Sequence, residues 1–149
     1  PGETVSNCLK IEAKEFTRRR LSVRETATLL MNMIARHPEK EFMFTVSPIR
    51  HFKDGAHGNQ ISKSTLLLAL DEVLAKFPER CEYFPAYEIV LDELRDYRFY
   101  AVDMIHPSDQ AVDYLWSRFV GFAMPESELP ALDARRRELL RSQHRPIHG

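Results

Sequence analysis

The feature that most constrains the fold is a continuous apolar run at residues 42–46, which shows no alternation of apolar and polar side chains. A strand of this kind is buried on both faces, which is typical of the interior of a parallel sheet. A second, short buried strand is expected at residues 81–84, and a helical pattern separates the two. Strands joined through helices in this way predict an α/β domain with right-handed crossovers.

Helical patterns surround these two runs. Ser22 and Glu25 form a capping box, which predicts a helix that begins there and stops before Pro38. The apolar residues expected on its inward side are Leu29, Leu30, Met33 and Ile34. Further helices are expected to begin at Ser62, after Pro85 and at Ser108, the last with Ala111, Val112, Leu115, Trp116 and Phe119 inward.

Two strands are too few for a complete domain of this class. An open parallel sheet covered on both faces needs about four or five strands. We therefore expect the chain to be the C-terminal portion of a larger domain, or to complete its sheet with another chain. The expected division is a domain portion over residues 1–122 and a charged helical extension over residues 123–149, whose helix covers about 128–141.

The segment 48–61 shows no periodic pattern, and a connection of this length in a compact domain is usually a functional loop. Arg50, His51 and Lys53 form a basic stretch that can bind an anionic substrate group, although a solvated turn explains the same composition. A metal site would have to group His51, Asp54, His57 and His106, but their spacing is not a recurring ligand pattern. We expect no metal and no other cofactor.

The segment 95–108 contains Asp103 and His106, three positions apart and just before Pro107. A carboxylate beside an imidazole is the minimum for a general base, because it fixes the tautomer and leaves one ring nitrogen free to accept a proton. An Asp that caps a turn beside an exposed His is the simpler interpretation of the same spacing. A triad also needs a nucleophile, and none of the candidates lies in a nucleophile-elbow motif. These candidates are Ser6, Ser47, Ser62 and Ser64.

Several longer motifs follow one another along the chain: FTVSPIRH at 44–51, KDG at 53–55, GNQ at 58–60, SKS at 62–64, YFPAYE at 83–88, DYRFY at 96–100 and DMIHPS at 103–108. Asn7-Cys8 and the AKEF segment at 13–16 fit the same pattern. Together these motifs resemble the bacterial GSCFA family, from about residue 6 to residue 119.

That family is similar to the SGNH/GDSL hydrolases, so the resemblance implies a three-layer α/β/α, flavodoxin-like fold with a parallel sheet. It also implies an early serine nucleophile and a late D-x-x-H that completes the triad. By resemblance, His106 is the base and Asp103 is its orienting partner. SGNH-type enzymes also use an Asn to stabilise the oxyanion, for which the resemblance offers Asn59 or Asn7, although neither lies in a G-x-N-D-like block. The Gly-Ser-Cys-Phe-Ala segment that carries the expected serine is absent from these 149 residues, in agreement with the small number of strands.

We therefore expect the C-terminal portion of a serine ester hydrolase, inactive by itself, whose substrate is a small-molecule or glycan ester. Two alternatives stay open. One is a non-catalytic binding or assembly module that forms a homo-oligomer through exposed sheet edges, and the other is an acyltransferase with the same Asp–His pair.

Composition and hydropathy restrict the classes of binding partner and the cellular location to be expected. The net charge of −1 gives no general attraction to nucleic acid. No run approaches the length of a membrane span, and the N-terminus lacks the apolar core of a signal peptide, which favours the cytoplasm.

Overall fold

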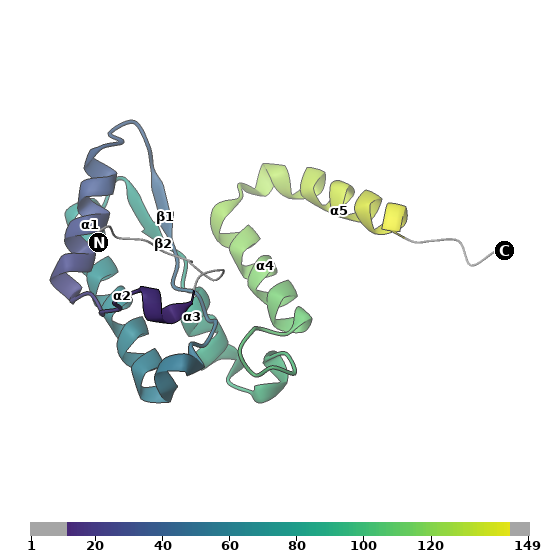
Figure 1. Cartoon of the computed structure of the whole chain (residues 1–149). Helices are drawn as coiled ribbons and strands as arrows, with labels where there is room; N and C mark the ends of the chain where they lie inside the picture. Colours follow the sequence, from purple (N-terminus) through teal and green to yellow (C-terminus); the bar gives the residue numbers. More distant parts are fainter. Residues whose placement is uncertain (1–11, 144–149) are drawn as a thin grey trace.

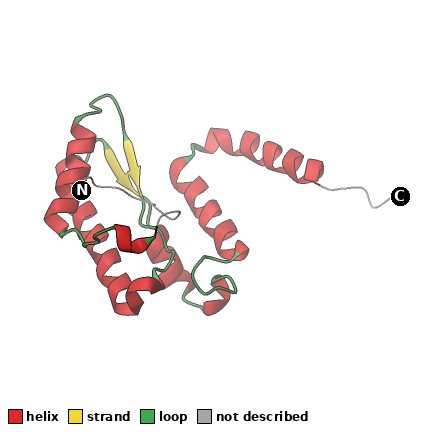
Figure 2. Ribbon diagram, in the orientation of Figure 1, coloured by secondary structure: helices red, strands yellow, loops and turns green. Residues whose placement is uncertain are grey.

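The computed structural model describes residues 12–143, which form a mostly helical α/β structure with one small parallel sheet (Figures 1 and 2). The main elements are α1 (Val23–Ala35), β1 (Phe42–Phe44), α2 (Gly55–Lys76), β2 (Cys81–Tyr83), α3 (Ala86–Glu88), α4 (Asp109–Ala123) and α5 (Leu129–Gln143). A π-helical turn, Ile89–Leu94, continues α3. Short 3-10 turns lie at Ala13–Glu15, Phe52–Asp54, Tyr97–Phe99 and Glu126–Glu128. The mixed α/β class predicted from the sequence is confirmed.

The sheet and two helices form the main core. β1 and β2 run parallel, with Phe42 opposite Cys81, and α2 connects them in a β-α-β unit. Ile34 of α1 and Val73 of α2 are fully buried and pack together with Cys81. Burial of each such aliphatic side chain stabilises the fold by roughly 1.5–3 kcal/mol. The core therefore ties both long helices to the sheet.

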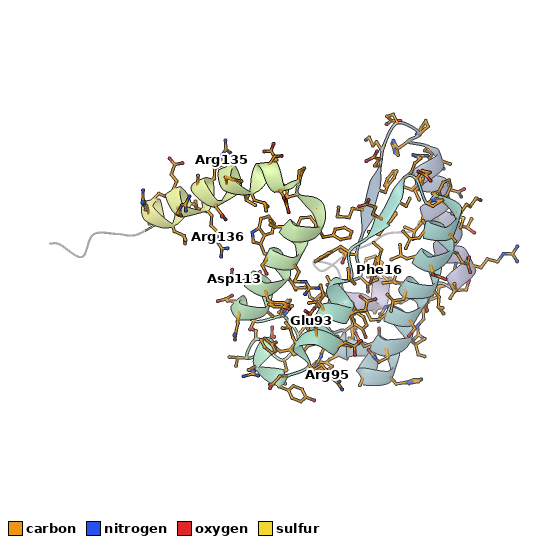
Figure 3. All side chains as sticks on the ribbon, turned by 180° about the vertical axis from the view of Figure 1, so that it is seen from behind. Phe16, Glu93, Arg95, Asp113, Arg135 and Arg136 are labelled. Atoms are coloured by element: carbon orange, nitrogen blue, oxygen red, sulfur yellow. The ribbon has the colours of Figure 1, made fainter. Side chains whose placement is uncertain are left out.

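A second cluster joins the segment after β2 to α4. Phe84 lies edge-on to Phe119 of α4, with the ring centroids 5.2 Å apart. The last helix, α5, extends away from the rest of the protein (Figure 1). Arg136 of α5 lies 3.4 Å from Asp113 of α4, and Figure 3 labels both side chains. The expected final helix is confirmed, whereas the domain boundary near residue 122 stays a prediction.

The predicted helix starts have mixed outcomes. The capping box is present: the Ser22 hydroxyl accepts from the Glu25 amide at 3.2 Å, and the Ser22 amide donates to Glu25. Ser108 likewise caps α4. The expected start at Ser62 is wrong, because α2 already begins at Gly55.

Much of the predicted long loop is therefore helical. Its first turns gave no helical signal because the inward positions, Asn59 and Lys63, are polar. Gly58 is needed there for close packing, since a Cβ atom would come within 2.8 Å of the Asp54 Cβ.

Several apolar side chains expected to be buried are exposed. Met43 of β1 is 44% exposed, so the prediction of a strand buried on both faces is wrong at this position. On α1 and α4 the apolar faces are wider than the buried stripes, which leaves Leu29, Met33, Val112 and Trp116 exposed. Ser6, Asn7 and Cys8 lie outside the described residues.

Candidate functional site

The candidate site is a tight turn between Tyr100 and Pro107, which face each other in an antiparallel bridge. Within it, the Ala101 amide donates to the carbonyl of His106 at 2.8 Å, and the Met104 amide donates to the carbonyl of Ala101 at 2.9 Å. Met104 has a φ of +59°, in the left-handed region. This reversal directs the chain back, so that residues 103 and 106 meet across the turn.

Both oxygens of the Asp103 carboxylate are used inside this turn. Oδ1 accepts from the amides of Ile105, at 2.8 Å, and His106, at 3.0 Å. Oδ2 lies 2.6 Å from Nδ1 of the His106 ring. The turn thus fixes the carboxylate by two backbone donors and leaves its second oxygen for the imidazole.

These contacts set the charge of the pair. The backbone amide of His106, the imidazole and the amide of Ile105 together lower the pKa of Asp103 to about 2. At neutral pH the carboxylate is ionised and accepts from Nδ1–H of the ring, so Nε2 is the nitrogen left to exchange a proton. The side chains of His106 and Asp103 are 57% and 45% exposed, which leaves the pair accessible to a substrate.

Arg50 fastens the turn to the segment that follows β1. Its amide donates to the carbonyl of Ile105 at 3.2 Å, and its Nη1 donates to the carbonyl of Met104 at 3.4 Å. The guanidinium carbon lies 3.8 Å from the centroid of the Tyr100 ring, a cation–π distance. The sequence segments 48–51 and 100–106 therefore form one local structure.

A cavity of about 510 Å³ lies beside this junction. Its walls are mainly aromatic and aliphatic, and its polar lining comes from Arg50, Asn59, Gln60 and the tyrosines. The Tyr100 hydroxyl is buried and has no hydrogen-bond partner among residues 12–143. A concave apolar site with a few placed polar groups is the usual form of a small-molecule pocket.

The structure separates the three residues predicted to bind substrate. Asn59 is buried, lines the cavity and accepts from the His51 amide at 2.9 Å. The side chains of His51 and Lys53 are exposed and do not line the cavity. Their role in binding stays a prediction, with Asn59 in the more suitable place.

Two cations lie near the site. One is Arg50, which belongs to the basic stretch predicted to bind an anionic group and lines the cavity. The other is Lys63, which was not predicted as a site residue; it is 3% exposed and donates from Nζ to the carbonyl of Ser47 at 2.6 Å. Burial lowers the pKa of this ammonium group. The available signal was the spacing of Asn59 and Lys63, one helical turn apart on the inward side of α2.

Neither a metal centre nor a membrane span is found within residues 12–143. No group of three or more His, Cys, Asp and Glu side chains there can hold a metal ion. Asp54, considered above as a ligand, instead forms a bidentate pair with Arg18 at 2.5 and 2.6 Å. No helix in this part of the chain is long and apolar enough to cross a membrane.

The fold and the turn together define a mixed α/β protein with a preorganised Asp–His pair beside an aromatic-lined cavity. The GSCFA family model matches residues 1–119, and the chain belongs to the GSCFA family. This confirms the resemblance seen in the sequence motifs. No curated protein and no solved structure matches the chain.

Proposed function

We propose that the chain supplies the Asp–His part of the catalytic triad of an SGNH-like serine ester hydrolase. His106 is the general base and Asp103 is the group that orients it. The observation that supports this proposal is the 2.6 Å contact between Nδ1 and Oδ2 in a turn held by two backbone amides. A base that is held in one orientation before substrate arrives loses little entropy in the reaction.

The proposed reaction assigns a role to each ring nitrogen. Nδ1–H of His106 stays bonded to Asp103, while Nε2 takes the proton from a serine hydroxyl as its oxygen attacks the acyl carbon. The imidazolium then returns this proton to the departing alcohol, and a water molecule repeats the sequence to release the acid. We expect the serine to come from outside the described residues.

The corresponding proposal for the fold is a three-layer α/β/α arrangement in which further parallel strands extend the sheet. The β1–α2–β2 unit has the expected parallel register. α1 and α2 pack together with both strands in one core, as one outer layer of such a fold would do. The candidate site follows the rule that ligands bind beyond the carboxyl ends of parallel strands, since residues 48–52 come shortly after β1.

Replacement of His106 by Ala tests the mechanism in the natural full-length protein, with short acyl esters as substrates. Loss of the base should lower kcat by roughly 10³-fold or more. His37→Ala is a matched control, because His37 is also exposed and lies 3.9 Å from a carboxylate, Glu39, away from the cavity. Turnover that is unchanged by His106→Ala, or lowered equally by both substitutions, would contradict the proposal.

A further inference from the structure

The polar walls of the cavity offer hydrogen-bond donors and no negative charge. Among the residues that the structure describes, no acidic side chain lines it. Its charged group is the guanidinium of Arg50, and its exposed amide is that of Gln60. A cavity of this composition favours a ligand group that only accepts hydrogen bonds.

Arg50 differs from other arginines of the protein in what it contacts. Arg18 and Arg118 form ion pairs with carboxylates. Arg50 instead lies over the rings of Tyr100, Tyr97 and Phe52, at 3.8, 5.6 and 6.0 Å from their centroids. Among the described residues its side chain makes one hydrogen bond, to the Met104 carbonyl, which is long at 3.4 Å. Within residues 12–143 the guanidinium therefore has no anionic partner and retains unused donors.

Gln60 is held with its donor end free. Its Oε1 accepts from the hydroxyl of Tyr87 at 2.6 Å and from Nδ2 of Asn59 at 3.3 Å. Asn59 is fixed in turn by the amide of His51. A rotated amide would place Nε2 against the Nδ2 donor of Asn59 and lose that bond, so the observed orientation is the one that satisfies both partners of Oε1. The structure shows no partner for Nε2 among the described residues. Gln60 thus presents an NH₂ group at the same cavity as Arg50.

We propose that this cavity is a subsite for an oxyanion group of the substrate, a carboxylate in the first instance, bound by Arg50 and Gln60. The planar guanidinium suits the two oxygens of a carboxylate, and the rings of Phe52 and Tyr97 suit a flat or apolar body attached to it. Arg50 also touches the Asp103–His106 turn through two backbone carbonyls, so the bound anion lies close to the pair. As a statement about substrate, this inference rests on the proposed function and specifies it: the ester carries a negative charge.

Binding can be measured apart from turnover, in the full-length His106→Ala variant. Benzoate and benzamide are matched in shape and differ in charge. We expect benzoate to bind roughly tenfold or more tightly than benzamide, and Arg50→Gln to remove that preference. Arg98→Gln is the matched control, because Arg98 also lies over an aromatic ring, Phe99 at 5.1 Å, but does not line the cavity. Equal binding of the two probes, or an equal loss with Arg98→Gln, would overturn the inference.

Arg50→Gln also removes packing, so a second variant and a second measurement are needed. Arg50→Lys keeps the charge and should retain part of the preference for benzoate, and added salt should weaken benzoate binding without affecting benzamide. With active protein, Arg50→Gln should lower kcat/KM for a 4-nitrophenyl hemisuccinate by a factor roughly tenfold larger than for the neutral 4-nitrophenyl butyrate, because any disturbance of the turn affects both esters and the lost charge affects only the first. Equal loss for both esters would show that Arg50 only positions the turn, which would overturn the subsite.

The two proposals fail in different ways. Charge-selective binding that depends on Arg50, without any ester turnover, would support the anion site and contradict the hydrolase function. Turnover that depends on His106, without any preference for an anionic probe, would support the hydrolase function and contradict the anion site.

Discussion

Two short turns of this protein hold a carboxylate in nearly the same way. At the start of α1, Oε2 of Glu25 accepts from the Ser22 amide at 2.9 Å, and Oε1 pairs with Arg19 at 2.9 Å. In the candidate site, one oxygen of Asp103 accepts from backbone amides and the other contacts His106. Both arrangements lower the pKa of the carboxyl group to about 2.

The difference lies in the partner of the second oxygen and in what the turn leads to. Arg19 keeps its proton at all ordinary pH values, so its pair with Glu25 has only a structural effect. An imidazole ring has one nitrogen that donates and one that can accept a proton, so the Asp103 pair can take part in proton transfer. The first turn continues into a helix, whereas the positive φ of Met104 prevents the second from doing so. The same local hydrogen bonding thus serves a helix start in one place and a candidate base in the other.

The largest expected effect is on catalytic activity, which should depend on the carboxylate of Asp103 and not on that of Glu25. Asp103→Asn in the full-length protein should lower kcat by about 10⁴-fold. The new amide can still accept from the two backbone donors through its oxygen, but its NH₂ faces Nδ1 and forces the unproductive tautomer. Initial rates on short acyl esters measure this loss.

Glu25→Gln is the matched control for this substitution. Glutamine also completes a capping box, so activity and fold should change little. Comparable activity losses in the two variants would mean that Asp103 acts only as a turn cap, as Glu25 does.

The next effect concerns the backbone of the two turns. Met104→Val places a β-branched residue at a φ of +59° and should cost about 1–2 kcal/mol in the free energy of unfolding, with loss of activity. Arg24→Val occupies the equivalent place in the first turn, where the backbone is helical, and should cost only about 0.5 kcal/mol. Denaturant unfolding measures both.

A glycine substitution checks the reason for that difference. Met104→Gly removes the backbone strain, so the turn should form as well as in the parent protein. If Met104→Val were as stable as Arg24→Val, the left-handed conformation would not be required for the turn.

The two turns also show what a sequence can predict. The capping box and the Asp103–His106 pair each depend on residues three positions apart, and both contacts are present. The spacing could not distinguish a turn cap from a base, because that distinction depends on accessibility and on the neighbouring cavity.

Contacts between residues far apart in the sequence were missed. Arg50 contacts a carbonyl 54 positions away and Lys63 one 16 positions away, so neither contact has a local pattern. The start of α2 was missed for a related reason. Asn59 and Lys63 lie at buried positions of this helix, where hydrogen bonds satisfy their polar groups, and as polar residues they interrupt the apolar periodicity of the sequence. The α/β class was predictable from the two expected strands and the helices around them, whereas the extent of burial was not, as exposed Met43 shows.

The smallest expected effect is on the pKa values of Glu25 and Asp103, which are low for different reasons. For Glu25 the largest cause is the Arg19 side chain, followed by the Ser22 amide. For Asp103 the largest cause is the backbone amide of His106, which an alanine at that position retains, followed by the imidazole. Arg19→Gln should therefore raise the pKa of Glu25 more than His106→Ala raises that of Asp103. Carboxyl-carbon NMR titrations from neutral pH down to about pH 2 measure both shifts.

The same titrations give the sign of the effect on stability. Each folded pKa lies below its ordinary value, 4.5 for Glu25 and 3.8 for Asp103. Each carboxylate therefore stabilises the folded state above that value and loses its contribution as the pH falls toward about 2. High salt should raise the pKa of Glu25 more than that of Asp103, because an exposed ion pair is screened and backbone hydrogen bonds are much less so. Equal shifts in salt and in the two variants would mean that the imidazole, rather than the turn, keeps Asp103 ionised, and the backbone amides would then be incidental to the pair.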